Sequence, residues 1–337
     1  GLTSLISLKC ENNQLSSLNI TGLTSLQELY LSYNQLATIN LNGFSNLKFL
    51  RCEANQFSSL NLSGLTNLQK LYCNANQLLS LNVSGLISLQ ELDCSYNQIT
   101  SLDGSGLPSL QTLTCSNNLL SSLNISGLIG LQTLSCNDNQ LSNLNINGLT
   151  NLQGLFCDNN QITSLNGNGF TNLQTLSCGH NQLQSLNTSG LKNLNALYCN
   201  NNQITSLDVN SCSNLNIISC GNNQLNALFI KNNNPNWISL DFSNNPNLTY
   251  ICADDADLSL VQQKINSYGY VATCQVNSYC SFTPGGTYYT INGTNHYDEN
   301  NNGCDALDSA FPYLKLNIDN GTTSGGLITD TTGSYFY

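Results

Sequence analysis

The chain has little charge, few basic residues and no long apolar run. Charged residues make up 8% of its 337 residues, where an ordinary soluble domain has roughly 25%. Eight Lys and Arg stand against 19 Asp and Glu, so the formal net charge is −11. Nucleic-acid binding needs clustered basic residues, and a membrane-spanning helix needs about 18 or more apolar residues in a row. The sequence therefore excludes both nucleic-acid binding through the phosphates and a membrane-spanning segment.

The sequence also lacks methionine altogether, and with it an initiator, and it has no signal peptide. We therefore expect that it begins downstream of the start of its gene and belongs to a longer, processed protein. Asn, Ser, Thr and Gln replace the missing charged residues, since they hydrate a surface without adding charge.

A 21-residue repeat dominates the first two thirds of the chain. Its unit reads L-x-x-L-x-C-x-x-N-Q-L-x-x-L-N-x-x-G-L-x-x, and eleven copies run in phase from Leu5 to about Asn234. Cysteine fills the sixth position except in the second copy, where Leu31 stands. An asparagine follows that position by three residues in every copy: Asn13, Asn34, Asn55, Asn76, Asn97, Asn118, Asn139, Asn160, Asn181, Asn202 and Asn223.

These units resemble the leucine-rich repeat family, whose L-x-x-L-x-[L/C]-x-x-N signature each of them carries. Alternating Leu and Cys point inward from a short parallel strand, and successive coils stack about 4.8 Å apart. The asparagine side chain turns into the coil and hydrogen-bonds backbone groups that the turn leaves unpaired. Losing one such amide should cost about 1–3 kcal/mol. We therefore assign residues 1–236 to a leucine-rich repeat array with an open N-terminal end.

Each unit is also a nested half-repeat. Leu68, Leu71 and Cys73 are echoed ten residues later by Leu78, Leu81 and Val83. The return side of the coil is then too short for a helix of useful length, and it carries Asn, Ser and Gly rather than helix formers. We predict a parallel-β solenoid with little helix, similar to the 21-residue subclass of bacterial leucine-rich repeats.

The stacked cysteines have two further interpretations, as metal ligands or as a disulfide ladder. Zinc sites need ligands two to four residues apart, and no such pair occurs in the array. A thiol at a leucine position is far more often a small buried hydrophobe. We interpret the ladder cysteines as core residues that react slowly until the protein unfolds.

The outward positions of the main strand are the candidate binding residues. In the first five coils they are mostly charged residues of both signs and tyrosines, and in the later coils they are mostly neutral, small and hydroxylic. Tyr and Arg are the usual anchors of protein interfaces. The alternative is a face that is only solvated. The predicted binding face consists of Tyr30, Arg51, Tyr72, Asp93, Phe156 and Tyr198.

Residues 237–280 form a predicted C-terminal cap with a cysteine-bearing linker. Asp257 begins and Gly269 ends an amphipathic segment, which predicts an N-capped helix. The natural role of this helix is to cover the last coil and its strand edge. Four cysteines outside the ladder can form two disulfides in any of three pairings: Cys252, Cys274, Cys280 and Cys304.

From residue 281 to 337 the composition shifts to Tyr, Thr and Gly with frequent turn signals, which predicts the start of an antiparallel β-sandwich. A complete sandwich needs about 100 residues, so we expect this module to be incomplete. One Asn-rich loop has oxygen donors at alternate positions and a tight-turn Gly, which suits Ca²⁺, although Ser309 stands where a full loop has Glu. The alternative is an Asn-rich turn. The candidate metal ligands are Asp298, Asn300, Asn302, Asp305 and Asp308.

The order of repeats, helical cap, linker and sandwich module is similar to large cell-surface leucine-rich repeat proteins of Bacteroidota. The resemblance implies export by type IX secretion. It also implies O-glycosylation of Ser or Thr after Asp, here at Ser309 and Thr331.

No catalytic motif accompanies the two histidines, His180 and His296, and no phosphate loop or paired carboxylates are present. We predict a non-enzymatic binding or adhesion protein that is secreted or held at the cell surface. Its expected partners are a protein or glycan there, the secretion machinery and the rest of its own longer chain. Two alternatives stay open: a structural stalk or filament-like spacer, and an accessory module that binds polysaccharide through its aromatic residues.

Overall fold

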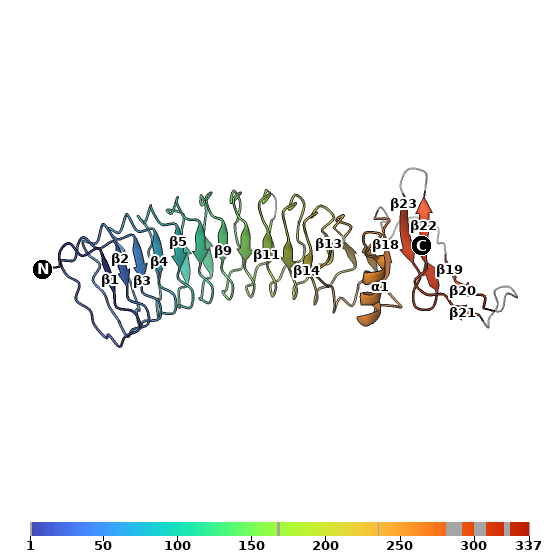
Figure 1. The fold of residues 1–337 in the computed structure, drawn as a ribbon, viewed down its shortest axis with the longest axis horizontal. Coiled ribbons are helices and arrows are strands. Elements are labelled where there is room, and N and C mark those ends of the chain that lie inside the picture. The colour runs from blue at the N-terminus through green and yellow to red at the C-terminus, as the bar shows by residue number, and fades with distance from the viewer. Residues whose placement is uncertain are drawn as a thin grey trace.

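The chain winds into a long solenoid whose coils stack along one axis (Figure 1). The computed structural model describes residues 2–166, 169–234, 236–280, 292–299, 308–319 and 324–336. Within these residues, twelve three-residue strands, one per coil, form a single parallel sheet. They are β1 (Ser7–Lys9), β2 (Glu28–Tyr30), β3 (Phe49–Arg51), β4 (Lys70–Tyr72), β5 (Glu91–Asp93), β7 (Thr112–Thr114), β9 (Thr133–Ser135), β10 (Gly154–Phe156), β11 (Thr175–Ser177), β12 (Ala196–Tyr198), β14 (Ile217–Ser219) and β16 (Ser239–Asp241).

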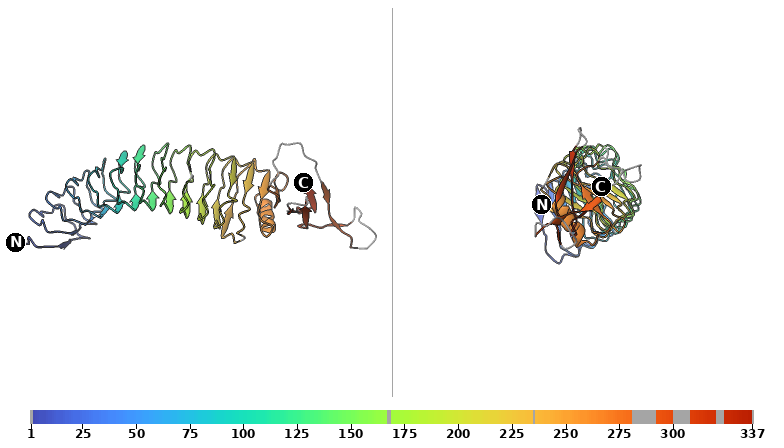
Figure 2. Two further views of the ribbon diagram at one scale, coloured as in Figure 1. Left: turned by 90° about the horizontal axis from the view of Figure 1, so that it is seen from above. Right: turned by 90° about the vertical axis from the view of Figure 1, so that its right-hand side faces the viewer.

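The 21-residue period sets the register of this sheet. Residues one period apart pair directly, as Tyr30 does with Arg51 and Arg51 with Tyr72. Because side chains alternate along a strand, the middle residue points into the core and the two flanking residues point outward. The sheet follows the inner side of a gently curved rod (Figure 2). The predicted parallel-β solenoid is confirmed.

The return side of the coils is extended, as the nested half-repeat predicts. β6 (Ser101–Asp103) pairs with β8 (Ser122–Asn124), and Asn166 bridges Asn187. The helix α1 (Leu258–Ser267) is the only one among the described residues, and it is too short to cross a membrane. Nearer the C-terminus a second sheet forms from β13 (Ser206–Asp208), β15 (Ala227–Phe229), β17 (Tyr250–Cys252) and β18 (Gln275–Asn277).

The ladder cysteines belong to the core. Cys10 is partly exposed, and the other nine are buried with free thiols. Loss of hydration on burial disfavours the thiolate, so burial raises the pKa of Cys94 and Cys136 to about 12. Neutral thiols at this depth act as small hydrophobes between leucines, as the sequence interpretation proposes.

The asparagine ladder binds successive coils together. In the second coil, Asn34 Nδ2 donates to Leu31 O at 2.9 Å in its own turn and to Cys10 O at 2.9 Å in the preceding coil. Its Oδ1 accepts from Leu15 N of that same preceding coil at 3.0 Å. Asn245, in a twelfth and degenerate coil, makes the same bonds to Cys220 O and Leu225 N. Each ladder amide therefore pairs with backbone groups of two coils. The sequence predicted only the hydrogen bonds to the turn within one coil.

Each turn places one residue with positive φ before its ladder asparagine. These residues have φ between 51° and 57°, a left-handed conformation that costs a side chain other than Gly roughly 1–2 kcal/mol. Asn and Asp tolerate it best, and most coils carry them, but four coils carry Ala or Tyr. The positions are Asn12, Tyr33, Ala54, Ala75, Tyr96, Asn117, Asp138, Asn159, His180, Asn201 and Asn222.

Replacing Ala75 by Gly is expected to stabilise the solenoid by about 0.5–1 kcal/mol, because Gly adopts positive φ without the steric cost. Ala75 is exposed, so no packing is lost. The matched control is Ala37→Gly, at an exposed alanine whose φ is not positive, which should destabilise by a similar amount because Gly relieves no strain there and only adds freedom to the unfolded chain. Urea unfolding of the two variants compares them, and equal shifts of the same sign would contradict the strain argument.

The helix α1 covers the end of the repeat array. Its buried residues pack against β18, and the residues after it reach the last coil of the main sheet. The Tyr268 ring packs edge-on to Phe242 at 5.1 Å, and the Tyr270 hydroxyl accepts a hydrogen bond from Asn245 N at 2.6 Å. The predicted helical cap is therefore confirmed.

The sequence predicted the C-terminal end of α1 correctly and the capping of its N-terminal end wrongly. Asp257 stands at the N-cap, but its side chain makes no capping hydrogen bond. The predicted N-cap hydrogen bond at the start of α1 is therefore wrong. The Asp257 carboxylate instead accepts, through Oδ2, from the indole Nε1 of Trp237 at 3.0 Å. Gly269 ends the helix as predicted: it has φ +80°, and Tyr270 N donates back to Ile265 O at 2.9 Å.

Among the described residues one disulfide forms, Cys252–Cys280, which joins β17 to the segment that follows β18. This bond belongs to one of the three pairings that the sequence left open, and the second disulfide of that pairing is not shown. Cys274 is buried with a free thiol, and Cys304 lies outside the described residues.

The antiparallel strands predicted after residue 280 are present. β22 (Lys315–Asp319) and β23 (Ser324–Ile328) form a hairpin, and β23 pairs with β18 through Asn277 and Leu327. The hairpin therefore extends the second sheet of the solenoid. Two further pairs are antiparallel: β19 (Asn292–Thr294) with β24 (Ser334–Phe336), and β20 (His296–Tyr297) with β21 (Ser309–Ala310).

Candidate binding face

The strand face, meaning the outward side chains of the twelve main-sheet strands, brings the six predicted binding residues into one row. Tyr30, Arg51, Tyr72 and Asp93 are direct neighbours on β2 to β5. Phe156 on β10 and Tyr198 on β12 lie farther along the same row. With strands about 4.8 Å apart, the row runs about 38 Å from Tyr30 to Tyr198.

The N-terminal part of the row alternates cations and aromatic rings in contact. Lys9 Nζ lies 4.8 Å from the centre of the Tyr30 ring, and Arg51 Cζ lies 4.8 Å from the centre of the Tyr72 ring. Each such contact contributes about 0.5–1 kcal/mol at an exposed site. The contacts fix the conformations of otherwise mobile side chains on the surface.

A parallel row on the same strands adds a charged cluster that the sequence analysis did not assign to the site. Lys70 Nζ stands 2.6 Å from Glu91 Oε1 and 6.0 Å from the Phe49 ring centre, while the Tyr72 hydroxyl donates to Glu91 Oε2. Burial by itself raises the pKa of Glu91, but the hydrogen bonds from Lys70 and Tyr72 lower it below its usual value. Burial and the same carboxylate raise the pKa of Tyr72 to about 12, so Tyr72 remains a neutral donor. The 21-residue offset between Lys70 and Glu91 was the signal that could have found this pair.

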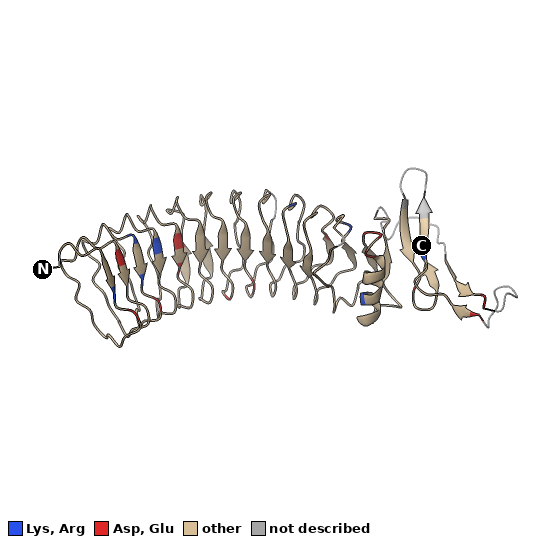
Figure 3. Ribbon diagram, viewed as in Figure 1, with Lys and Arg blue, Asp and Glu red and all other residues tan. Residues whose placement is uncertain are grey.

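Charge on the strand face is concentrated at this end. Lys, Arg, Asp and Glu occur on strands β1 to β5, and the main-sheet strands beyond carry none until Asp241 in the last coil (Figure 3). The outward residues from β7 to β14 are instead mostly Thr, Ser and small residues. The face therefore has two halves of different chemistry, as the sequence asymmetry predicted.

A second polar ladder runs beside the neutral half. Asn137 N donates to Ser116 Oγ at 3.1 Å, Asp158 N to Asn137 Oδ1 at 2.8 Å, and Gly179 N to Asp158 Oδ1 at 2.8 Å. Each side chain thus holds the backbone of the next coil. The ladder fixes the edge of the strand face, and no motif in the sequence marked it because Ser, Asn and Asp share the role.

The predicted calcium loop is described only in part. Asn300, Asn302 and Asp305 lie outside the described residues, while Asp298 is half-buried and Asp308 buried. Among the residues that the structure describes, no group of three His, Cys, Asp or Glu side chains could hold a metal ion. Calcium binding at 298–308 stays a prediction.

The two predicted O-glycosylation residues are both exposed. Ser309 lies on β21, and its hydroxyl donates to Glu299 Oε1 at 3.0 Å. Thr331 lies in a turn that the Asp330 carboxylate closes by accepting from Thr332 N and Ser334 N. Their accessibility suits modification, which stays a prediction.

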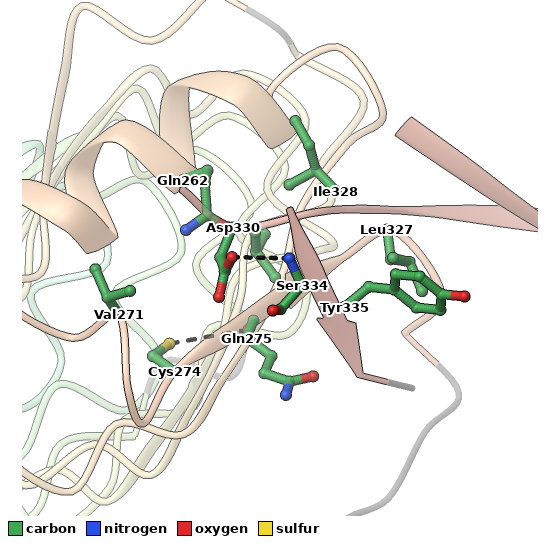
Figure 4. A pocket seen from close by; sticks show the side chains of 10 residues that line it. Gln262, Val271, Cys274, Gln275, Leu327, Ile328, Asp330, Ser334 and Tyr335 are labelled. Carbon is green, nitrogen blue, oxygen red and sulfur yellow. Dashed lines mark hydrogen bonds between the residues drawn. The ribbon is translucent and has the colours of Figure 1, made fainter. Parts of the chain in front are cut away.

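A small pocket of about 120 Å³ lies between the cap and the C-terminal strands (Figure 4). Gln262 of α1, Cys274 and Gln275 line one side, and Asp330 and Tyr335 line the other. Burial raises the pKa of Cys274 to about 12, so its thiol is not a nucleophile at neutral pH. Asp330 serves its own turn, and the pocket brings no second acid or base to it. We therefore interpret the pocket as a packing gap between the cap and the C-terminal strands.

The leucine-rich repeat family, described as two copies of the repeat, matches residues 87–128 and 171–212. None of the curated proteins matches the chain. Among solved structures, the functional domain of InlJ from Listeria monocytogenes, whose description notes a cysteine ladder, is similar with 29% identity and a TM-score of 0.67. That match covers 75% of this chain and 60% of the InlJ domain, so the chain spans less than two thirds of its relative.

Two other bacterial structures share the fold at similar identity. A leucine-rich repeat protein of Leptospira interrogans is 26% identical, with 82% of this chain and 84% of that chain covered and a TM-score of 0.58. YopM from Yersinia enterocolitica is 25% identical, with 72% and 54% covered and a TM-score of 0.62. With eleven in-phase repeats, a parallel solenoid and these neighbours, the chain is a leucine-rich repeat protein with repeats of the bacterial type.

Proposed function

We propose that this chain is a non-enzymatic binding protein of the cell surface or extracellular space, and that it docks a protein partner on strands β1 to β5. The observation that carries the proposal is the in-register row of Lys9, Tyr30, Arg51, Tyr72 and Asp93. Tyr and Arg are the residues that most often dominate binding energy. Because stacking already orders them, little side-chain entropy is lost when a partner binds.

The charge distribution supports the same end of the solenoid. Four of the eight cations, Lys9, Lys48, Arg51 and Lys70, lie in the first four coils, although the chain as a whole has a net charge of −11. A mixed-charge surface suits a protein partner with complementary charges, since such surfaces discriminate between partners and steer association. We also propose export by type IX secretion and an origin in Bacteroidota. Only the order of the domains supports these two points.

Alanine at Tyr72 or at Arg51 is expected to weaken binding at least about tenfold, equivalent to 1.4 kcal/mol or more for an anchor residue. The measurement is biolayer interferometry of the purified chain against immobilised cell-envelope extract of the source, with and without protease treatment of that extract. Thr133→Ala, in the neutral half of the strand face, is the matched control. Unchanged affinity in both variants, or binding that survives proteolysis of the extract, would contradict docking of a protein at β1 to β5.

The alternative is a structural stalk, which the coil-bridging asparagine ladder favours because it makes the array a stiff rod. Deleting residues 103–144, two whole periods, leaves strands β1 to β5 intact. A docking function keeps its affinity in this variant and loses it in Tyr72→Ala. If the chain is a stalk, the deletion should change its function and Tyr72→Ala should leave that function unchanged.

A further inference from the structure

The aromatic side chains of the strand-face row form two pairs, and the members of each pair lie two coils apart. Tyr30 and Tyr72 are two coils apart, and so are Phe156 and Tyr198, with Thr114 at the intervening place in the series. Two strand spacings amount to about 9.6 Å. The coils between the rings carry hydrogen-bonding side chains: Arg51, Asp93, Ser135, Ser177 and Ser219.

The two rings in the neutral half lie differently from those near the N-terminus. Phe156 lies across the bare Cα of Gly154, where a Cβ would stand 3.0 Å from its Cε2 atom. On β12 the equivalent outward residue, Ala196, is small and buried beside Tyr198. A small residue at this place leaves room for the neighbouring ring close to the sheet, and both rings stay partly exposed to solvent. On β2 and β4 the equivalent residues are the long Glu28 and Lys70.

The outward strand side chains between these two rings are hydroxylic and uncharged, and the Asp158 carboxylate beside them is bound by Ser177 Oγ and Gly179 N. Thr175 and Ser177 of β11 lie between Phe156 and Tyr198. Ser177 Oγ donates its proton to Asp158 Oδ1 at 2.8 Å, which leaves the oxygen lone pairs of Ser177 to accept from a ligand hydroxyl. No outward strand residue from β7 to β14 is charged. A ligand for this surface is therefore neutral and rich in hydroxyl groups.

We propose that Phe156, Ser177 and Tyr198 form a binding site for a neutral, extended β-1,4-linked polysaccharide that runs along the solenoid axis. In such a chain every second sugar presents the same face, and the repeat of two sugars is close to two strand spacings. The apolar faces of sugars one and three then stack on the two rings, while the hydroxyls of sugar two meet Ser177 and Thr175. The proposal rests on the strand face being a docking surface, and it names the ligand class of its second half.

The charge and curvature of the ligand follow from the same geometry. An anionic glycan would approach a chain of net charge −11 without any cation on these strands to receive it. An α-1,4-linked glucan coils, and it would not keep alternate sugars in line with two rings on a straight row. The geometry of the glycosidic linkage, β or α, should therefore decide which glycan binds.

The test is calorimetric titration of the purified chain with cellohexaose, with maltohexaose as the α-linked control of equal composition. Cellohexaose should bind, maltohexaose should bind at least about tenfold more weakly, and cellobiose likewise, because two sugars cannot reach both rings. Phe156→Ala and Tyr198→Ala should each lower the affinity for cellohexaose about tenfold. Tyr96→Ala, a change at an exposed tyrosine outside the strand face, should leave it unchanged.

A spacing variant separates the arrangement of the rings from their mere presence. Ser177→Tyr combined with Tyr198→Ser puts the two rings on adjacent coils and should abolish the advantage of cellohexaose over cellobiose. Equal affinity for the α- and β-linked hexaoses, or no binding of cellohexaose, chitohexaose and mannohexaose by the unaltered chain, would overturn the proposal.

The two docking sites are told apart by crossing the variants. Tyr72→Ala should weaken binding to envelope protein and leave cellohexaose binding intact, and Phe156→Ala should do the reverse. If only the protein site fails, the glycan proposal stands, and if only the glycan site fails, the proposed function stands.

Discussion

Raising the pH from 8 to 10 is expected to remove most of the folding free energy of the solenoid. Nine ladder cysteines are buried, and burial raises the pKa of their thiols, to about 12 for Cys94 and Cys136. In an unfolded chain the same thiols ionise near pH 8.5. The unfolded state therefore releases protons across a pH range in which the folded state holds them.

The sign and size of the effect follow from proton linkage. Below about pH 8 the thiols are neutral in both states, so their contribution to stability is constant. As the pH rises above the unfolded pKa toward the folded pKa, the unfolded state binds fewer protons and stability falls. Each thiol costs about 1.4 kcal/mol per pH unit, so nine together cost on the order of 10 kcal/mol per unit, as much as the whole stability of a typical domain.

Urea unfolding followed by circular dichroism at pH 7, 8, 9 and 10 measures this loss. The double variant Cys94→Leu and Cys115→Leu is the matched control, since Leu31 fills the same position in the second coil. It should reduce the slope of stability against pH by about two protons. A denaturation midpoint that stays constant from pH 8 to 10 would show that the thiols do not carry the effect.

Replacing one interior ladder asparagine is expected to destabilise the solenoid by about 3 kcal/mol. Asn118 Nδ2 donates to Cys115 O at 3.1 Å and to Cys94 O at 3.0 Å, and its Oδ1 accepts from Ile99 N at 3.0 Å. Asn118→Ala leaves these buried backbone groups in two coils without that partner, at about 1–3 kcal/mol for each group left unsatisfied. Asn118→Asp should cost more at neutral pH, because a buried carboxylate would face the carbonyl oxygens that the amide now binds.

The chain supplies its own control for this prediction. Asn13 is exposed and donates only within its own coil, to Cys10 O and Glu11 O at 3.0 Å each. Asn13→Ala should therefore cost less than about 1 kcal/mol, since water replaces the lost bonds. Differential scanning calorimetry of both variants makes the comparison. Equal losses at residues 13 and 118 would mean that bridging between coils adds nothing to stability.

The sequence alone determined the features that depend on the 21-residue period. Because the period fixes the register, residues such as Tyr30, Arg51 and Tyr72 had to be neighbours on one row, and the ladder cysteines had to be core. The half-repeat excluded helices from the return side. In a solenoid each coil contacts mainly the coils beside it, so a periodic pattern is enough to place a residue on a face.

The tertiary structure alone decided the contacts that have no period. Asp257 binds Trp237 instead of capping its helix, and Cys252 pairs with Cys280, because the cap folds these residues together at irregular separations. The stacking of Arg51 on Tyr72 and the close approach of the Phe156 ring to Gly154 depend on side-chain rotamers and on the size of the neighbouring residue. A repeat pattern specifies the strand and the face on which a side chain lies, whereas packing against its neighbours decides its rotamer and its contacts.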